Sequence, residues 1–400
     1  SNLLTAYLLT ANLLTARVIE KAMIPTTLKA AYVSNSWATR MAASALSTYS
    51  PDKWLWHYEH GLFVDALAKA SIATGETSFE SFAQDWVDHF VTPSGDIRTY
   101  RLEDFNLDQI KPGKLLFPLY RRTGDARYAN ALELLRKQIQ NQPRTASAGF
   151  WHKKIYPFQM WLDGIYMAAP FYAEYAITFD EPHLLDDVVH QFILIEQHTR
   201  DPQSGLLYHA WDESKQQIWA NPQTGCSPQF WGRAMGWYAM ALVDVLDILP
   251  ESHAGYPTLV SILDRLANAL LRVQDAATGL WYQVADKPNS PGNYRETSVS
   301  AMLVYAFARA VRKGYLAPDY QFAAQRAYRG LLENMIKVDA RGLLTLEGTC
   351  SVAGLGGEPY RDGSYEYYVA EPTAADDFKG VGPFILAALE MDASGTKDQA

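Results

Sequence analysis

Two kinds of helical pattern alternate along the chain. The first is amphipathic and rich in charge, as in ALELLRKQIQ, which is typical of a helix with one face in solvent. The second is apolar nearly all round, as in GWYAMALVDVLDIL, which indicates a helix buried on every side. The amphipathic segments lie near residues 33–48, 77–91, 127–140, 183–198, 256–274 and 319–337. The apolar segments lie near residues 58–73, 106–121, 158–177, 230–249, 295–311 and 374–391.

The punctuation between these segments also repeats. TGE at residues 74–76 and TGD at residues 123–125 each end one helical pattern and open the next. A second signature, an aspartate shortly before Gly-Leu, recurs in residues 201–208, 275–282 and 339–344. Repeats of this size indicate stacked helix pairs. Six buried helices alternating with six amphipathic ones predict an all-α fold in one domain, an (α/α)6 barrel with an inner ring inside an outer ring.

Strand-like pieces are short, and we expect them as hairpins near residues 206–211 and 280–285. The residues that carry chemistry fall in one class of connection, which leads from an outer helix to an inner one. We therefore expect these connections to meet at one mouth of the barrel. They are WLWHYEHG, EDFNLDQIKPG, GFWHKKIYPFQMWLDG, QTGCSPQFWGRAMGW, GNYRETS and YRDGSYEYYVAEP.

One aspartate stands out in the most apolar of these stretches. Asp163 is the only charged residue between Ile155 and Ala173. Burying an unpaired carboxylate is costly, so a stable fold keeps one only where it is paired or has a function. The other interpretation is a helix cap, because Asp is favoured at helix starts. The aromatic residues on both sides favour the wall of a cleft.

The predicted mouth combines aromatic and polar side chains. Aromatic faces interleaved with polar groups suit sugar rings, whose C–H faces stack while their hydroxyls need hydrogen bonds. Any single tryptophan is as often part of the core, so the clustering in six analogous connections carries the interpretation. The residues are Tyr58, Trp151, Trp161, Trp231, Trp237 and Tyr367, with Asp108, His152, Asp163, His209 and Arg233.

Composition and charge narrow the function further. The 400 residues carry a net charge of -9, which argues against nucleic acid or an anionic membrane as a partner. No run approaches the roughly 18 apolar residues of a membrane helix. Cys226 and Cys350 are too few for a disulfide framework and favour reduced thiols in the cytoplasm, although a single bridge between them stays open.

Other chemistries fit the sequence poorly. It has no HExxH motif, no paired CxxC and no GxSxG elbow, and we expect no metal, no cofactor and no obligate protein partner. We interpret GLGG at residues 354–357 as a flexible flap near the site, since no βαβ unit surrounds it. In residues 1–22 LLTA occurs three times, with a period that fits neither helix nor strand. We treat this stretch, which lacks the pattern of a secretory signal, as an N-terminal extension or cloning remnant, and residues 23–400 as the barrel.

Three strings resemble the unsaturated rhamnogalacturonyl hydrolases of glycoside hydrolase family 105. They are WHKKIYPFQMWLDGIYMAAPFYAEYA (151–176), SPQFWGRAMGWYAMALVDVLDILP (227–250) and GSYEYYVAEPTAADDFKGVGPFILAALEM (363–391). The resemblance runs from about Trp37 to Met391, and that family's fold is an (α/α)6 barrel. It implies hydrolysis of small oligosaccharides made by pectin lyases. A 4,5-unsaturated uronic acid is removed from the non-reducing end by hydration of its double bond, which releases rhamnose or a rhamnose-ended product.

The resemblance also implies roles for individual residues. Asp163 would be the general acid and base, and Asp108 a second carboxylate that binds the sugar and tunes its partner. The remaining positions would bind substrate: Tyr58, His152, Trp161, His209, Trp231, Arg233 and Trp237. Arg233 suits the uronate carboxylate, because a planar guanidinium can pair with it twice, and its alternative is a structural ion pair with a buried acid. His57 and His60 we interpret as packing or surface residues.

Three alternatives remain open. A glucuronyl hydrolase acting on glycosaminoglycan fragments would share the fold and the mechanism. A sugar epimerase on the same toroid would rely on paired histidines and need no C4–C5 double bond. A non-catalytic sugar-binding protein would show no turnover.

Overall fold

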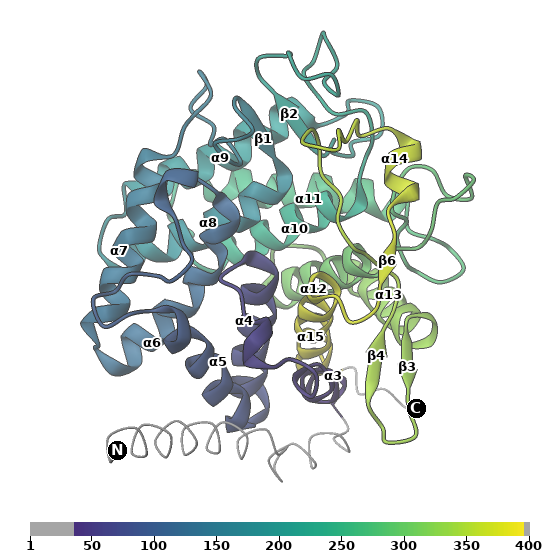
Figure 1. Cartoon of the computed structure of the whole chain (residues 1–400). Helices are drawn as coiled ribbons and strands as arrows, with labels where there is room; N and C mark the ends of the chain where they lie inside the picture. Colours follow the sequence, from purple (N-terminus) through teal and green to yellow (C-terminus); the bar gives the residue numbers. More distant parts are fainter. Residues whose placement is uncertain (1–35, 396–400) are drawn as a thin grey trace, which may run out of the picture.

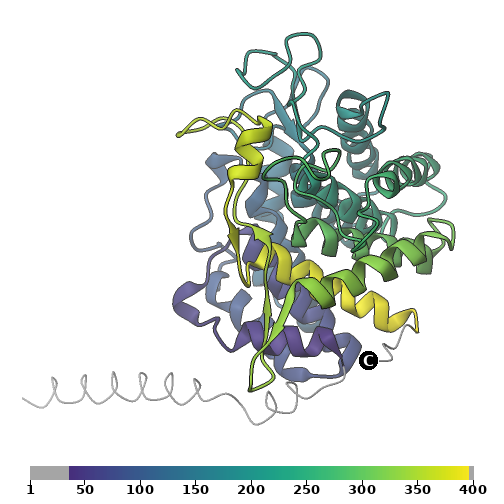
Figure 2. The ribbon, with the colours of Figure 1, turned by 90° about the vertical axis from the view of Figure 1, so that its right-hand side faces the viewer.

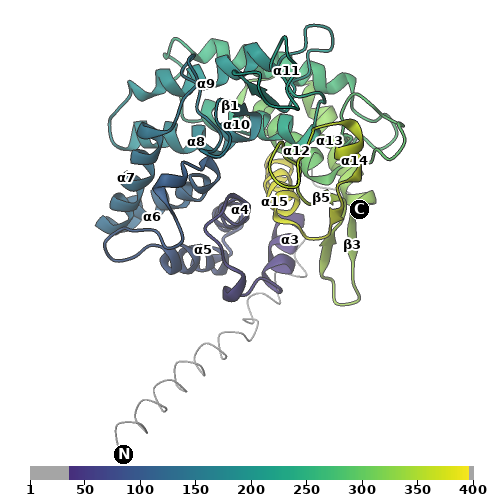
Figure 3. The same ribbon diagram turned by 45° about the horizontal axis from the view of Figure 1, so that its top comes forward.

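An inner ring of helices forms the barrel in the computed structural model, which describes residues 36–395 (Figures 1 and 3). Each member of the ring packs on the next, and α15 packs on α4 and closes it. The members are α4 (Tyr58–Thr74), the segment η4–α6 (Lys111–Leu115 and Leu116–Thr123), α8 (Leu162–Thr178), α10 (Gly232–Leu246), α12 (Thr297–Lys313) and α15 (Phe378–Ala393). The predicted apolar segments thus form the inner ring.

The amphipathic segments form the outer ring. Each outer helix packs on an inner neighbour with its apolar face and leaves its charged face outside. These helices are α3 (Trp37–Leu46), α5 (Thr77–Phe90), α7 (Ala126–Asn141), α9 (Leu184–Thr199), α11 (Tyr256–Arg272) and α13 (Tyr320–Asn334). The predicted (α/α)6 barrel is confirmed. The stretch 1–22 lies outside the described residues.

The punctuation signals end helices in the way that glycine allows. Gly75 follows α4 and Gly124 follows α6, both with φ in the left-handed region (76° and 65°), where each caps the last turn. The side chain of Asp125 then accepts the amide of Arg127 and starts α7. The TGE and TGD strings therefore mark places where an inner helix ends and an outer one begins.

The structure divides one predicted helix into pieces. The sequence predicts a single helix over residues 106–121, whereas the chain forms η3 (Leu107–Gln109), η4 and α6 in succession. Pro112 cannot donate a backbone hydrogen bond, which weakens regular helix here. Gly61 and Gly113 let this segment lie unusually close to its neighbours: a Cβ on Gly61 would come within 2.8 Å of Pro112, and one on Gly113 within 2.4 Å of Leu135. The shorter turns hold Asp108 at the mouth.

The strands pair in three antiparallel couples. They are β1 (Gln159–Trp161) with β2 (Ala210–Asp212), β3 (Ile336–Val338) with β4 (Leu344–Leu346), and β5 (Thr349–Cys350) with β6 (Thr373–Ala374). The predicted local hairpins are wrong in their pairing. Residues 210–212 pair with β1 from an earlier connection, and residues 282 and 284 form only isolated bridges. Alternation along a strand does not specify its partner, which here is set by the barrel.

Pairing of β1 with β2 shapes the mouth. The short sheet and the helix α14 (Tyr365–Ala370) stand at one end of the barrel, and the β3–β4 hairpin projects near the other (Figures 1 and 2). The amide of Leu162, the first residue of α8, donates to the carbonyl of His209 at 3.1 Å. This contact places Asp163 beside His209. In residues 36–395 no helix is both long and apolar enough to cross a membrane.

Candidate active site

Side-chain contacts join all six outer-to-inner connections at one mouth. The contacts that cross from one connection to another are Asp108 with His57 and with His152, Asp163 with His209, His209 with Tyr368, and Arg233 with Glu296. The sequence-predicted convergence is therefore observed. Asp108 and Asp163 both lie in it, with contrasting partners.

Asp108 is a locked, ionised carboxylate. Its Oδ2 lies 2.5 Å from Lys153 Nζ and its Oδ1 lies 3.3 Å from His152 Nε2, and the residue is only 4% exposed. Burial raises the pKa of Asp108, but Lys153 and His152 more than offset it, so that this pKa lies well below its usual range. The side chain of Asn106 accepts the amide of Asp108 at 3.0 Å and fixes the turn. Asp108 is thus a permanent anion and hydrogen-bond acceptor.

Asp163 has no such cation. It is the second residue of α8, its side chain is 13% exposed, and its Oδ2 lies 3.2 Å from His209 Nε2. Burial lowers the pKa of His209, although Asp163 opposes this, so the imidazole is neutral at neutral pH. Throughout residues 36–395 no lysine or arginine lies within 4.0 Å of the Asp163 carboxylate. This carboxylate is largely buried and has no countercharge within 4.0 Å in residues 36–395.

The helix-cap interpretation of Asp163 is wrong. The N-cap position of α8 is Trp161, and no side chain caps this helix. Asp163 lies inside the first turn, where the helix dipole favours an anion, and within the described chain its buried Oδ2 faces only His209 Nε2, 3.2 Å away in poor hydrogen-bond geometry. A carboxylate held this weakly is what a group kept for chemistry would present.

The predicted tryptophans are buried supports of the site. His152 and Tyr156 lie parallel to Trp161, with ring centroids 4.8 and 4.9 Å away. Trp231 donates through its Nε1 to Gln283 at 3.0 Å. The exposed fractions of Trp161, Trp231 and Trp237 are 6%, 1% and 1%. Their role as sugar-stacking surfaces stays a prediction.

Tyr58 lies among the charges of the mouth. It is half-buried, with its ring edge-on to Trp237 at 6.0 Å. Burial raises the pKa of Tyr58 well above its usual value, and the nearby acids, including Asp108 and Asp163, raise it further. The hydroxyl therefore stays protonated and can donate to a bound sugar.

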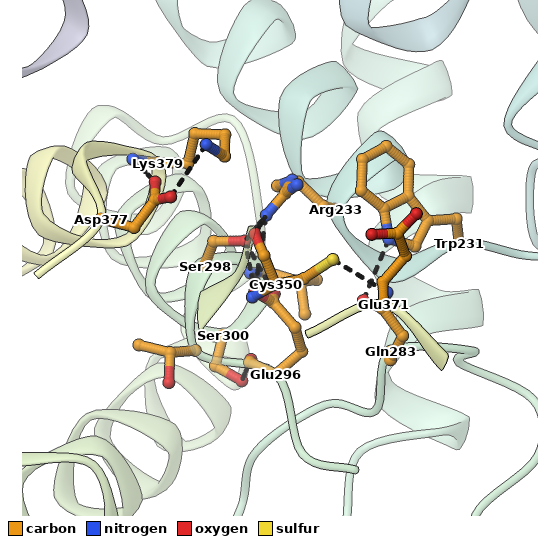
Figure 4. A network of polar contacts seen from close by, with 12 residues as sticks. Trp231, Arg233, Gln283, Glu296, Ser298, Ser300, Cys350, Glu371, Asp377 and Lys379 are labelled. Carbon is orange, nitrogen blue, oxygen red and sulfur yellow. Dashed lines mark hydrogen bonds and ion pairs between the residues drawn. The ribbon is translucent and has the colours of Figure 1, made fainter. Parts of the chain in front are cut away.

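Arg233 sits in a buried polar network (Figure 4). Its Nη1 donates to the carbonyl of Cys350 at 2.5 Å and lies 3.7 Å from Glu296 Oε1. Glu296 is itself fully buried and accepts the amide of Cys350 at 2.8 Å. The ion pair with a buried acid, the alternative interpretation of Arg233, is therefore present. Binding of a uronate carboxylate by Arg233 stays a prediction.

Three site residues escaped the sequence analysis. Lys153 pairs with Asp108, and Tyr368 contacts His209 with its hydroxyl 2.7 Å from Nδ1. His57, interpreted as a packing or surface residue, has its Nε2 4.0 Å from Asp108 Oδ2. His60 does pack, against Tyr49. The adjacency of Lys153 to His152 was the one available signal, and nothing local marked Tyr368.

The structure also places the GLGG segment at residues 354–357 and the two cysteines. Leu355 is fully buried beside Trp161 and Trp219, and the amide of Gly354 donates to Tyr367 Oη at 3.0 Å. The segment that we interpreted as a flap thus lies beside Trp161, near the site, and its flexibility stays a prediction. Cys226 and Cys350 are both buried and free, so the bridge between them is not formed. Among residues 36–395 no three His, Cys, Asp or Glu side chains converge as metal ligands.

Comparisons with known proteins place these features in a family. The profile described as Glycosyl Hydrolase Family 88 matches residues 30–394. A glycoside hydrolase of family 105 from C. acetobutylicum ATCC 824 is 46% identical, with a TM-score of 0.87 over 90% of this chain and 99% of that one. The unsaturated rhamnogalacturonyl hydrolase YesR of Bacillus subtilis is 28% identical over 63% of this chain and 70% of its own length.

A more distant structure shares the fold alone. The unsaturated glucuronyl hydrolase of Bacillus sp. GL1, responsible for the degradation of glycosaminoglycan, superposes with a TM-score of 0.62. It is 14% identical and covers 86% of this chain and 88% of its own.

Proposed function

The chain belongs to Glycosyl Hydrolase Family 88, and we propose that it removes a 4,5-unsaturated uronic acid from the non-reducing end of rhamnogalacturonan lyase products. Membership makes the chain a glycosidase, so the alternatives of a sugar epimerase and of a non-catalytic binding protein fall away. The similarity to YesR supports rhamnogalacturonan fragments over glycosaminoglycan fragments. The buried free thiols of Cys226 and Cys350 support a cytoplasmic location.

The contrast between the two carboxylates carries this proposal. A glycosidase that cleaves the glycosidic bond directly places two carboxylates across that bond. Here Asp108 is paired with Lys153, whereas in residues 36–395 Asp163 has no lysine or arginine within 4.0 Å. One exchangeable carboxylate suits hydration of a double bond, in which the same group gives one proton and takes another.

The reaction then balances around Asp163. Its carboxylic acid donates a proton to C4, and the electron deficit appears at C5 and the ring oxygen as an oxocarbenium-like charge. Water attacks C5 and returns a proton to Asp163. The hemiketal formed at C5 opens, and the sugar beyond is released. The fixed charge of Asp108 stabilises the cationic transition state.

His209 and Tyr368 set the orientation of the acid. Because the His209 imidazole is neutral, only one of its nitrogens carries a proton. Burial raises the pKa of Tyr368 far above neutrality, so its hydroxyl can donate to Nδ1 at 2.7 Å, which leaves the proton on Nε2. Nε2–H then faces Asp163 Oδ2 at 3.2 Å. This contact leaves Oδ1 as the oxygen from which Asp163 would deliver a proton to C4.

We expect Tyr368→Phe to lower kcat by about tenfold with little change in KM, because it frees the His209 tautomer but removes no substrate contact. Nitrogen-15 NMR of His209 should show protonated Nε2 in the unaltered enzyme and a tautomer mixture in the variant. Tyr367→Phe, one residue away, is the matched control and should leave the His209 signals unchanged. An unchanged tautomer with normal kcat in Tyr368→Phe would remove Tyr368 from the mechanism.

The substrate assignment is tested by two lyase-generated disaccharides, one from rhamnogalacturonan and one from chondroitin. Hydration destroys the conjugated enol acid, so its ultraviolet absorbance should disappear with the first disaccharide and persist with the second. Loss of absorbance only with the chondroitin disaccharide would assign the enzyme to glycosaminoglycan fragments.

A further inference from the structure

A row of side chains leads from the buried Asp108 to the surface. His152, 3% exposed, contacts Asp108, and the half-buried Tyr156 lies beyond it with a ring centroid 6.5 Å away. The planes of the two rings differ by 10°, and both rings lie parallel to Trp161. The row thus forms one aromatic wall that starts beside Asp108 and continues outward.

Arg361 stands at the outer end of this wall without a countercharge. Its Nη2 donates to Tyr156 Oη at 2.9 Å, and its Nε donates to the carbonyl of Gly356 at 2.7 Å. Both acceptors are neutral. Within the part of the chain that the structure describes, no carboxylate lies within 4.0 Å of this guanidinium, although Glu358 and Asp362 are close in sequence. A cation fixed in this way is poised for an external anion.

The surroundings of Arg361 form a surface pocket with polar walls. Its lining includes Tyr156, Gln159, Gln217, Gly356 and Pro359, with Glu358 as the one acidic side chain. A cation with two amide side chains beside it suits an acidic sugar.

We propose that this pocket is a subsite for a second uronate residue of the substrate, whose carboxylate pairs with Arg361. The inference rests on the proposed function, because uronate and rhamnose alternate in rhamnogalacturonan. The first sugar after the unsaturated residue is then a neutral rhamnose, and the next bears a carboxylate. An unsaturated tetrasaccharide reaches Arg361, whereas the disaccharide ends before it. The chain thereby selects longer lyase products.

The test compares kcat/KM for the unsaturated disaccharide and tetrasaccharide by loss of ultraviolet absorbance. The unaltered enzyme should favour the tetrasaccharide by about tenfold, the scale of one charge-assisted contact. Arg361→Gln should abolish this advantage and leave the disaccharide within about twofold. Arg361→Lys, which keeps the charge and loses the planar fork, should retain part of it.

Failure of the subsite and failure of the proposed function would give different results. Equal losses with both substrates in Arg361→Gln would make Arg361 a structural tie of the flap and overturn the subsite, as would an unaltered enzyme with no preference for length. If the unaltered enzyme consumed neither substrate, the proposed function would fail. Calorimetric binding of the tetrasaccharide to the enzyme and to Arg361→Gln would then still decide the subsite, because equal affinities contradict it.

Discussion

Asp163→Asn should lower turnover by at least about a hundredfold, the scale of a general acid and base, while the substrate still binds. The amide has nearly the size and shape of the carboxylic acid but cannot deliver a proton to C4 or take one from water. Its neighbour His209 is neutral, so the substitution leaves no cation unpaired and should cost little stability. The measurements are kcat by ultraviolet absorbance and affinity by calorimetry.

A matched control lies at the opposite end of the same helix. Asp180 is exposed just after α8, and Asp180→Asn should be indistinguishable from the unaltered enzyme. Turnover in heavy water adds a check on mechanism, because hydration delivers a solvent proton to C4 and should leave deuterium there. Product without deuterium at C4, or near-normal kcat in Asp163→Asn, would refute hydration by Asp163.

Much of the fold could be predicted because the residue pattern of a helix indicates how many of its faces are buried. A helix that touches neighbours on every side has no polar face, as in α10, where every residue is buried. The outer helix α7 keeps a polar face and only six buried residues. The residues of one segment do not indicate which distant segment it will contact. The pairing of β1 with β2 joins residues about fifty positions apart, and the sequence predicted only local hairpins there.

The same distinction holds for the candidate site: residues with unusual local surroundings could be predicted, whereas residues defined by a distant partner could not. Asp163 could be found because a lone charge among apolar residues is unusual wherever it occurs. Tyr368 could not, because its partner His209 is 159 residues away and a tyrosine in YEYYVA looks like its neighbours. The sequence identified Arg233 as a cation of the candidate site. It did not identify Glu296 as the buried acid that pairs with Arg233, because the two residues meet only in the folded barrel.

In the proposed mechanism, two acids of the same kind take different tasks because their surroundings differ. Lys153 and His152 lower the pKa of Asp108 and keep it ionised, whereas Asp163 faces the neutral imidazole of His209. Separate environments that fix one carboxylate as an anion and free another for proton transfer are what acid-base chemistry near neutral pH requires. The division can be tested at Asp108 independently of Asp163.

Asp108→Asn should also lower kcat by about a hundredfold or more, because a neutral amide cannot stabilise the positive charge that develops at C5. It should reduce stability as well. The pKa of Asp108 is depressed in the folded state, so its ionisation stabilises the fold above about pH 4, the pKa of an unfolded Asp, and this contribution is lost as the pH falls further. The loss should stay below the about 3 to 5 kcal/mol of a broken buried pair, since Lys153 is 21% exposed and can turn to water.

Urea unfolding at pH 7 and below about pH 4, together with kcat, separates the two effects. The stability difference between Asp108→Asn and the unaltered enzyme should shrink in acid, where the native carboxylate loses its advantage. Asp104→Asn, an exposed change four residues earlier, should alter neither quantity. If Asp108→Asn lost stability but kept its kcat, the anion would serve only to hold Lys153 and His152 in place. The negative charge that stabilises the transition state would then have to come from Asp163 alone. Asp163 cannot be both the proton-donating acid and a fixed anion in the same step.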